Sequence, residues 1–256
     1  MLKTQRLYAD SVKNIRLIAT DMDGTLTQSG KFTARMLQTL TDLARAGIPV
    51  LVVTGRSAGW VEGIVSYLPV QGAIAENGGL FYSADGELHL ISPIRDIQNH
   101  RANLSQTFAS LSAEYPMLHE SSDNRFRITD WTFDVEGLSR SELQTLQERC
   151  EAQGWSFTYS TVQCHIKPHG QDKATALLEV LQAQFSDFNP DHVLTVGDSP
   201  NDESLFNPVQ FPHSVGVANV LDYLNQMTHP PRFVTQHAEA EGFCEMSEML
   251  LSDRMR

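Results

Sequence analysis

Short, almost continuously apolar runs alternate with longer amphipathic stretches over the first eighty residues. The runs are "NIRLIATD", "IPVLVVTG" and "GAIAENGG", and each ends in polar residues or glycine. Residues 33–47 and 57–69, which separate them, have the spacing of amphipathic helices. The helical face of residues 33–47 is expected to contain Met36, Leu37, Leu40, Leu43 and Ala44. This β-α-β-α-β order with buried strands predicts a parallel sheet covered by helices on both faces.

The pattern changes between about residues 81 and 167. "RDIQNHRANLSQTFASL" predicts a helix, and the aromatic and β-branched segment "FRITDWTFDV" predicts an antiparallel strand. "SRSELQTLQERCEAQG" begins with a capping box formed by Ser139 and Glu142 and ends at Gly154. "SFTYSTVQCHIKP" predicts two more strands. This block therefore has the composition of a small α+β domain.

The α/β pattern resumes with the helix "GQDKATALLEVL", the strands "HVLTVGD", "HSVGVAN" and "PRFVT", and the helix "EAEGFCEMSEMLL". Residues Ala174, Leu177, Leu178 and Leu181 form the apolar face of the first of these helices. We therefore predict an α/β core domain made of residues 1–82 and 169–256, with residues 83–168 inserted as a cap domain.

Composition narrows the classes of partner. The chain of 256 residues has a formal net charge of −12 and no cluster of lysine and arginine, which argues against a nucleic-acid partner. It has no apolar run long enough to span a membrane, and the first residues lack the apolar core of a signal peptide. Three widely separated cysteines indicate neither a disulfide framework nor a zinc site, and Cys244 is expected to be a buried thiol. A cytoplasmic location is expected, as a monomer or a homodimer.

Polar side chains follow three of the predicted strands. They are Asp21 and Asp23 in "TDMDGT", Thr54 in "VVTGRS", and Asp198 and Asp202 in "VGDSPND". In open parallel sheets, ligands bind beyond the carboxyl ends of the strands, so these side chains are expected to converge. Four carboxylates in one place would repel each other strongly without a cation. Because oxygen ligands suit hard divalent cations, convergence predicts a metal site, with Mg²⁺ as the expected ion.

The acidic residues allow two plainer interpretations. Each aspartate could simply cap the turn that follows it, although three such turns at three strand ends are the weaker explanation. An EF-hand calcium loop starting at Asp21 would need glycine at its sixth position and glutamate at its twelfth. Leu26 and Phe32 stand there instead, so the calcium loop is rejected.

Lys173 is unusual because it lies in the first turn of a predicted helix, where the helix dipole disfavours a cation. It is either a surface lysine or a lysine that faces an anion, such as Asp21 or a phosphoryl oxygen. The "TGRS" turn offers the Thr54 hydroxyl and the backbone N–H groups of Gly55 and Arg56 as a cradle for phosphate oxygens.

These four elements, "DMDGT", "VVTGRS", Lys173 and "GDSPND", resemble in their order the four motifs of the haloacid dehalogenase (HAD) superfamily. The position of the insertion resembles the type-B C2-cap group, which includes Cof-like hydrolases and sucrose-phosphate phosphatases. The short cap is most similar to archaeal phosphoglycolate phosphatases, whereas "ESLF" after Asp202 resembles the sucrose-phosphatase version. The resemblance implies a Rossmann-like HAD core and a phosphatase of a small soluble phosphorylated metabolite, either phosphoglycolate-like or a sugar phosphate.

The resemblance also implies residue roles. Asp21 would attack phosphorus and form an aspartyl-phosphate, while Asp23 would act as acid and base and would need a raised pKa. Mg²⁺ would be held by Asp21, the backbone carbonyl of Asp23, Asp198 and Asp202. Lys173 would favour the ionised nucleophile, and Asn201 would orient Lys173 or a phosphate-bound group. The candidates for substrate contact are Arg56, Asn77, Arg125, Arg127, His165, Lys167 and His169.

Two other functions stay open at this point. A phosphomutase of the same fold would return the phosphoryl group to a bisphosphate intermediate instead of transferring it to water. A non-catalytic metabolite-binding protein is disfavoured because all four motif positions are intact.

Overall fold

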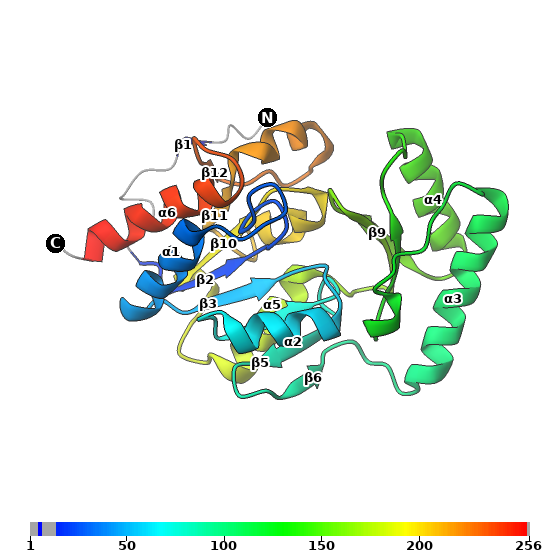
Figure 1. The fold of residues 1–256 in the computed structure, drawn as a ribbon, viewed down its shortest axis with the longest axis horizontal. Coiled ribbons are helices and arrows are strands. Elements are labelled where there is room, and N and C mark those ends of the chain that lie inside the picture. Colours follow the sequence, from blue (N-terminus) through cyan, green and yellow to red (C-terminus); the bar gives the residue numbers. More distant parts are fainter. Residues whose placement is uncertain (1–4, 7–13, 255–256) are drawn as a thin grey trace.

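The computed structural model describes residues 5–6 and 14–254, which form a large and a small part (Figure 1). The large part contains a nine-stranded sheet in the order β1-β12-β11-β10-β2-β3-β4-β5-β6. Neighbouring strands from β1 to β4 are parallel, and β5 and β6 are antiparallel additions at one edge. In sheet order the strands are Gln5–Arg6, Phe233–Val234, Ser214–Gly216, Val193–Gly197, Leu17–Thr20, Val50–Val53, Gly72–Ala75, Leu80–Ser83 and Leu88–Leu90.

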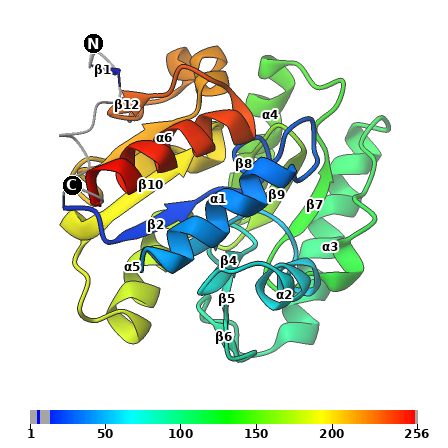
Figure 2. The ribbon, with the colours of Figure 1, turned by 60° about the vertical axis from the view of Figure 1, so that its left-hand side comes forward.

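Helices cover both faces of this sheet, as the sequence predicts. Helices α1 (Ala34–Arg45) and α6 (Glu239–Arg254) lie together on one face, and α5 (Lys173–Gln184) lies on the other (Figure 2). Helix α2 (Ala58–Tyr67) packs into the same apolar cluster as α1 and α6. Alternate residues of β3 pack into the apolar clusters on the two faces of the sheet. Val50 and Val52 face α1, and Val53 faces α5. Both faces of the central strands are therefore buried.

The buried face of α1 differs from the one predicted. Leu37 and Ala44 are exposed, whereas Thr39 is buried together with Met36 and Leu40. The reason is that α1 packs against α6, and the Thr39 hydroxyl lies 3.3 Å from the Sγ atom of Cys244 on that helix. Cys244 is buried as expected.

The hairpin β5–β6 was not predicted. It continues the large sheet to Leu90, beyond the predicted end of the core at residue 82. The sequence of this segment does not indicate a buried strand, because β6 lies at the edge of the sheet. Its Leu88 and Leu90 are exposed, and it lacks the continuous apolar run of the central strands. The division into core and cap stays a prediction, and this hairpin belongs with the core sheet.

The small part is a three-stranded antiparallel sheet, in the order β7 (Trp131–Asp134), β9 (Gln163–Lys167), β8 (Ser156–Tyr159). Helices α3 (Ile97–Glu114) and α4 (Arg140–Ala152) pack on it around a separate apolar cluster. The strand predicted over residues 126–135 is wrong at its start, because residues 124–126 form a 3-10 turn. The remaining 3-10 segments are Pro190–His192, Pro200–Phe206, Ala218–Asp222 and Leu224–Gln226.

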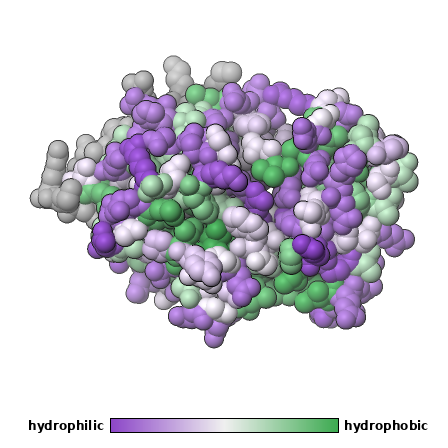
Figure 3. All heavy atoms as spheres, in the orientation of Figure 1, coloured by the Kyte–Doolittle hydropathy of each residue, from purple (hydrophilic) through white to green (hydrophobic). Residues whose placement is uncertain are grey.

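No helix in the described part of the chain is both long enough and apolar enough to cross a bilayer. The face drawn in Figure 3 is largely hydrophilic, with hydrophobic residues gathered in the region of α1 and α2.

The capping box of α4, formed by Ser139 and Glu142, is expected to stabilise the first turn of that helix. The Ser139 hydroxyl accepts from the Glu142 N–H, and the Glu142 carboxylate accepts from the Ser139 N–H at 2.8 Å. Replacing Ser139 by alanine leaves the first turn uncapped, so we expect a loss of about 1 kcal/mol in the free energy of unfolding. Urea unfolding measures it, with Ser66→Ala, at an exposed serine in the interior of α2, as the control. Equal losses in both variants would contradict the capping role.

Candidate active site

Four neighbouring strands of the large sheet each end directly before a polar residue. Asp198 follows β10, Asp21 follows β2, Thr54 follows β3 and Glu76 follows β4. Because these strands are parallel, the four side chains meet at one edge of the sheet. All four are buried. The convergence predicted from the sequence is therefore present, and it includes a residue, Glu76, that the sequence analysis did not assign.

Lys173 connects two carboxylates at this edge. Its Nζ atom donates to Asp21 Oδ1 and to Asp202 Oδ1, each at 2.6 Å. Lys173 is buried at the first position of α5, which explains its unusual place in the sequence, since it faces anions as expected. Burial alone would lower the pKa of Lys173, but Asp202 and Asp21 raise it above its ordinary value. Lys173 is therefore a fixed positive charge.

Asp198 is held in place by hydrogen bonds to both of its oxygens. Thr25 donates its hydroxyl to Oδ1 at 2.9 Å, and Asn219 donates its amide to Oδ2 at 2.9 Å. Gly24 lies against this carboxylate with φ +80, and a Cβ there would come 2.6 Å from Asp198 Oδ2. Only glycine allows the turn to approach so closely. Thr25 and Asn219 are positioning residues that the sequence analysis missed.

The carboxylates form a donor set suited to a divalent cation. One oxygen from each of Asp21, Asp198 and Asp202 lies within 4.8 Å of the others, and all three residues are buried. Burial, followed by repulsion from Asp202, raises the pKa of Asp21 to about 7 despite Lys173. Burial and the same neighbouring carboxylates also raise the pKa of Asp198 well above its ordinary value. A single lysine does not balance this negative charge, and hard oxygen donors fit a cation such as Mg²⁺.

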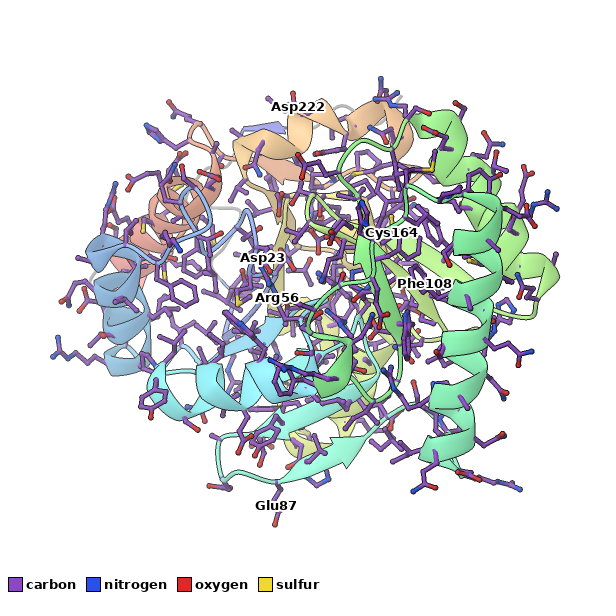
Figure 4. All side chains as sticks on the ribbon, turned by 45° about the vertical axis from the view of Figure 1, so that its right-hand side comes forward. Asp23, Arg56, Glu87, Phe108, Cys164 and Asp222 are labelled. Atoms are coloured by element: carbon purple, nitrogen blue, oxygen red, sulfur yellow. The ribbon has the colours of Figure 1, made fainter. Side chains whose placement is uncertain are left out.

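The carboxylate of Asp23 lies outside this group and pairs with Arg56 instead. Arg56 donates from Nε to Oδ2 at 2.8 Å and from Nη2 to Oδ1 at 2.7 Å, which makes a bidentate ion pair (Figure 4). The hydrogen bond to Asp23 raises the pKa of Arg56. Arg56 also lies over the Trp60 ring, 5.3 Å from its centroid. The metal role predicted for the Asp23 backbone carbonyl stays a prediction.

A narrow pocket joins this edge to the small domain. It is lined by Asp21, Asp23, Thr54, Gly55, Arg56 and Asn201 from the large domain, and by Ser160, Val162, Gln163 and His165 from the small one. Its free interior is about 10 Å³, room for about one water molecule. The predicted phosphate cradle at Thr54 and Gly55 lies in this pocket.

Most of the basic residues predicted to contact substrate have other partners. Arg127 is buried and donates to Asp123, Asp130, Gln163 and the Gly55 carbonyl. Arg125 does not alternate with it along a strand, because it lies in the exposed 3-10 turn with its guanidinium over Phe126.

Lys167 of β9 and His169 of the following loop also have partners within the protein. Lys167 donates to the Gln171 carbonyl, and His169 is exposed with its Nδ1 atom 2.8 Å from the Ser156 hydroxyl. Of the basic residues predicted to contact substrate, Arg56 and His165 line the pocket among the described residues.

Asn77 and Asn201 contact each other rather than Lys173. Asn201 donates its amide to Asn77 Oδ1 at 3.1 Å and accepts from the Ser199 hydroxyl. Asp202, not Asn201, therefore orients Lys173. Asn77 adopts φ +53 in the turn after β4, and its Nδ2 atom is buried without a hydrogen-bond partner. Asn201 lines the pocket, so it can reach a bound group.

Glu76 joins the large domain to the small one. Its carboxylate accepts from the N–H groups of Ala58 and Ile128 and from both the N–H and the hydroxyl of Thr129. Burial, with repulsion from Asp130, raises the pKa of Glu76. Its sequence signal is the same as that of Asp21 and Asp198, an acid directly after a buried strand.

Comparison with known proteins agrees with this geometry. The family model of sucrose-6F-phosphate phosphohydrolase matches residues 14–246, which is most of the chain. The chain belongs to the sucrose-6F-phosphate phosphohydrolase family. Since proteins of this family are phosphatases of the HAD superfamily, this chain is a phosphatase of the same superfamily.

Curated relatives of this family member carry another name. A phosphoglycolate phosphatase of Methanothrix thermoacetophila is 25% identical over 236 residues, covering 91% of this chain and 95% of the relative. One from Thermoplasma volcanium is 25% identical over 194 residues, covering 75% of this chain and 81% of the relative.

Solved structures show that the fold is shared. A crystal structure from Thermoplasma acidophilum has a TM-score of 0.75 at 22% identity, covering 93% of this chain and 99% of that chain. A haloacid dehalogenase-like hydrolase from B. subtilis has a TM-score of 0.69 at 18% identity, covering 91% and 99% respectively. This member of the sucrose-6F-phosphate phosphohydrolase family therefore has the HAD fold.

Proposed function

We propose that the protein is a Mg²⁺-dependent phosphomonoesterase that acts through an aspartyl-phosphate at Asp21. The observation that carries this proposal is the Lys173 ammonium, which lies 2.6 Å from both Asp21 and Asp202 beside Asp198. This arrangement fixes one oxygen of Asp21, and the Lys173 charge offsets part of the rise in the Asp21 pKa that burial and Asp202 cause. Aspartates that only capped surface turns would not require a buried lysine between them.

In the first half-reaction Asp21 is the nucleophile. Lys173 holds Oδ1, so we assign Oδ2 as the oxygen that forms the bond to phosphorus while the bond to the leaving oxygen breaks. Asp23 supplies a proton to the leaving oxygen. Because Arg56 pairs with Asp23 in this structure, we assign that step to a state in which the substrate has separated the pair and Asp23 carries a proton.

In the second half-reaction Asp23 is the base. It accepts a proton from water, the water oxygen bonds to phosphorus, and the bond from phosphorus to Asp21 breaks. Inorganic phosphate leaves and the Asp21 carboxylate is regenerated. The Asp23–Arg56 pair in this structure suits this step, because the two hydrogen bonds from Arg56 orient the Asp23 carboxylate. The Thr54 hydroxyl and the Gly55 N–H group are assigned to the phosphoryl oxygens, whereas the Arg56 N–H donates to the Thr54 oxygen at 3.1 Å.

Asp21, Asp198, Asp202 and the Asp23 backbone carbonyl are the residues that we assign to Mg²⁺. When bound, the ion would neutralise charge on the phosphoryl oxygens and on the buried carboxylates. Lys173 and the Thr25 and Asn219 hydrogen bonds fix the orientation of the carboxylates independently of it.

The substrate class follows from the small domain. We propose that it is an α+β cap of the C2 type that closes over a small soluble phosphorylated metabolite, without nucleic-acid partners. The relatives are named phosphoglycolate phosphatases and the family is that of sucrose-6F-phosphate phosphohydrolase, which correspond to the two substrate types expected from the sequence. A cytoplasmic location and a monomeric or homodimeric state stay predictions.

Phosphate release tests the proposed function. Purified protein is assayed with p-nitrophenyl phosphate, phosphoglycolate and hexose phosphates, with and without Mg²⁺, for inorganic phosphate and for isomerised sugar phosphate. Phosphate release that needs Mg²⁺, with a transient phosphoryl adduct on the peptide containing Asp21, is the expected result. Isomer formation without phosphate release would support the phosphomutase alternative and overturn this proposal.

Removing Mg²⁺ should lower the free energy of unfolding, because the buried carboxylates of the site then lack a balancing cation. Saturating Mg²⁺ at about 100 times its dissociation constant should add about 2.7 kcal/mol to the free energy of unfolding. Asp198→Asn should abolish most of this increment, while the metal-free variant is at least as stable as the metal-free native protein because one buried charge is gone. Urea unfolding with and without Mg²⁺ measures both effects. An undiminished Mg²⁺ increment in Asp198→Asn would show that the ion binds elsewhere.

A further inference from the structure

Glu76 is a buried charged side chain that the proposed reaction does not use. It is 0% exposed, and it is not among the described residues that line the pocket over Asp21. Burying a carboxylate is unfavourable unless hydrogen bonds replace the water that it loses. Here four donors converge on its two oxygens. An amide or a hydroxyl has one accepting oxygen, so a carboxylate is the group suited to join this many donors.

The four donors belong to two domains. Ala58, the first residue of α2 in the large domain, donates its N–H to Oε1 at 3.0 Å. Ile128 donates to Oε1 at 3.0 Å and to Oε2 at 3.1 Å. Thr129 donates to Oε2 from its N–H at 2.6 Å and from its hydroxyl at 2.7 Å. The last two residues directly precede β7 of the small domain, so one carboxylate binds both domains.

Residues 54–58, here called the cradle loop, lie against the turn that contains Glu76. The Glu76 N–H donates to the Arg56 carbonyl and the Asn77 N–H donates to the Thr54 carbonyl, each at 3.0 Å. With the bond from the start of α2, three hydrogen bonds join the cradle loop to this turn. Glu76 and Asn77 adopt the left-handed conformation, with φ +54 and +53. Two such residues in succession persist only where their surroundings fix them.

This turn orients the Gly55 N–H. In a planar trans peptide, the carbonyl of Thr54 and the N–H of Gly55 point in opposite directions. The Asn77 N–H that holds the Thr54 carbonyl therefore directs the Gly55 N–H away from the turn. Gly55 lines the pocket, and no acceptor among the described residues takes its N–H. This donor is available to a phosphoryl oxygen.

The small domain also contacts the cradle loop directly. Arg127 donates to the Gly55 carbonyl at 2.9 Å. A Cβ on Gly59, the residue after Ala58, would come 3.1 Å from the Phe126 Cβ. Residues 126–129 therefore run beside the cradle loop and the first turn of α2. Glu76 joins this segment to the cradle loop through a single side chain.

We propose that Glu76 is a positioning residue for phosphoryl binding, because its carboxylate holds the cradle loop and residues 128–129 of the small domain in one arrangement. The proposal rests on the proposed phosphatase function and adds a residue that acts through the Gly55 N–H. An anion bound at that N–H and a small domain seated on Glu76 then favour each other, since coupling between two sites is reciprocal.

Glu76→Gln tests this role, because it keeps the shape of the side chain and leaves it one accepting oxygen. In either orientation the amide nitrogen faces a backbone N–H, so the bonds to the two domains cannot all persist. We expect the inhibition constant of inorganic phosphate and the KM for p-nitrophenyl phosphate each to rise about tenfold. Mg²⁺ should stabilise the variant against urea as much as it stabilises the native protein, since Glu76 is not assigned to the ion.

The sign of the change separates positioning from plain electrostatics. Removing a buried negative charge would by itself strengthen the binding of an anion. An unchanged or lower inhibition constant for phosphate in a folded Glu76→Gln protein would therefore overturn the proposal, and so would a weaker response to Mg²⁺, which would indicate a general defect. Glu179→Gln, the same substitution at an exposed position of α5, is the control and should keep the native constants.

Thr129→Val tests the same role from the small domain without changing the charge. It removes the hydroxyl that donates to Glu76, at a residue that is not among the described residues lining the pocket. The inhibition constant of phosphate should rise about threefold, and Thr129→Ser, which keeps the hydroxyl, should have the native value. Equal constants in the valine and serine variants would overturn the proposal. This pair also decides it if Glu76→Gln does not fold.

Failure of this inference is distinguishable from failure of the proposed function. Phosphate release that Asp21→Asn abolishes, together with native phosphate inhibition in Glu76→Gln, would overturn the positioning role alone. Absence of phosphate release by the native protein from every substrate assayed would overturn both.

Discussion

Replacing Asp21 by asparagine is expected to reduce the rate of phosphate release by about 10⁴-fold or more while the protein stays folded. The amide cannot form the bond to phosphorus, so the covalent route is closed. Its oxygen can still accept from Lys173, which lies 2.6 Å from Oδ1 in the native protein. The variant also removes one buried carboxylate, so its free energy of unfolding without Mg²⁺ should not fall. Phosphate release and urea unfolding measure the two effects.

The matched control is Asp85→Asn, the same substitution at an exposed position in the β5–β6 hairpin turn. It should keep full activity. Turnover by Asp21→Asn within about tenfold of the native rate would refute the nucleophile assignment, provided that mass spectrometry shows no deamidation back to aspartate.

Removing the ammonium of Lys173 should have the largest effect on stability. Lys173→Met keeps much of the side-chain volume but leaves Asp21 and Asp202, both buried, without their cation. Breaking a buried ion pair by removing one partner costs about 3–5 kcal/mol. Mg²⁺ should restore part of this loss because it supplies the missing positive charge, so urea unfolding with and without Mg²⁺ is the measurement. Phosphate release should also fall strongly.

Lys167→Met provides the comparison, since it replaces the other buried lysine near the site. Its partner is the neutral Gln171 carbonyl, and burial lowers the pKa of Lys167. Loss of that single hydrogen bond should cost about 1–3 kcal/mol, and Mg²⁺ should not restore it. If the two variants lose the same stability and respond alike to Mg²⁺, the charge-balancing role of Lys173 is wrong.

The order of the core elements was predictable from the sequence because buried parallel strands leave a strong signal. The apolar runs that precede Asp21, Thr54 and Asp198 became β2, β3 and β10, and their last residues set the polar edge of the sheet. A strand buried on both faces must be apolar throughout, so its ends are visible without any knowledge of its neighbours. Ser139 and its capping box were visible for the same reason, since the signal is local.

The errors occurred where burial depends on a distant partner. Thr39 faces the core of the protein because α6 packs on that side of α1, and nothing in residues 33–47 specifies that helix. The exposed Leu88 and Leu90 hid an edge strand, because an edge pairs on one side only and needs no apolar run. In the sequence, Arg125 and Arg127 have the spacing of two residues on one face of a strand. The 3-10 turn at Arg125 breaks that alternation.

The sequence by itself determined the chemistry available at the polar edge: Asp21, Thr54, Lys173, Asp198 and Asp202 in an order that resembles one superfamily. Only the tertiary structure decided how the charges are distributed. It paired Asp23 with Arg56, surrounded Arg127 with acceptors and placed His165 beside Asp130 at the pocket. The physical reason is that a motif fixes which groups a turn carries, whereas ion pairing and burial depend on segments that meet only when the chain is folded.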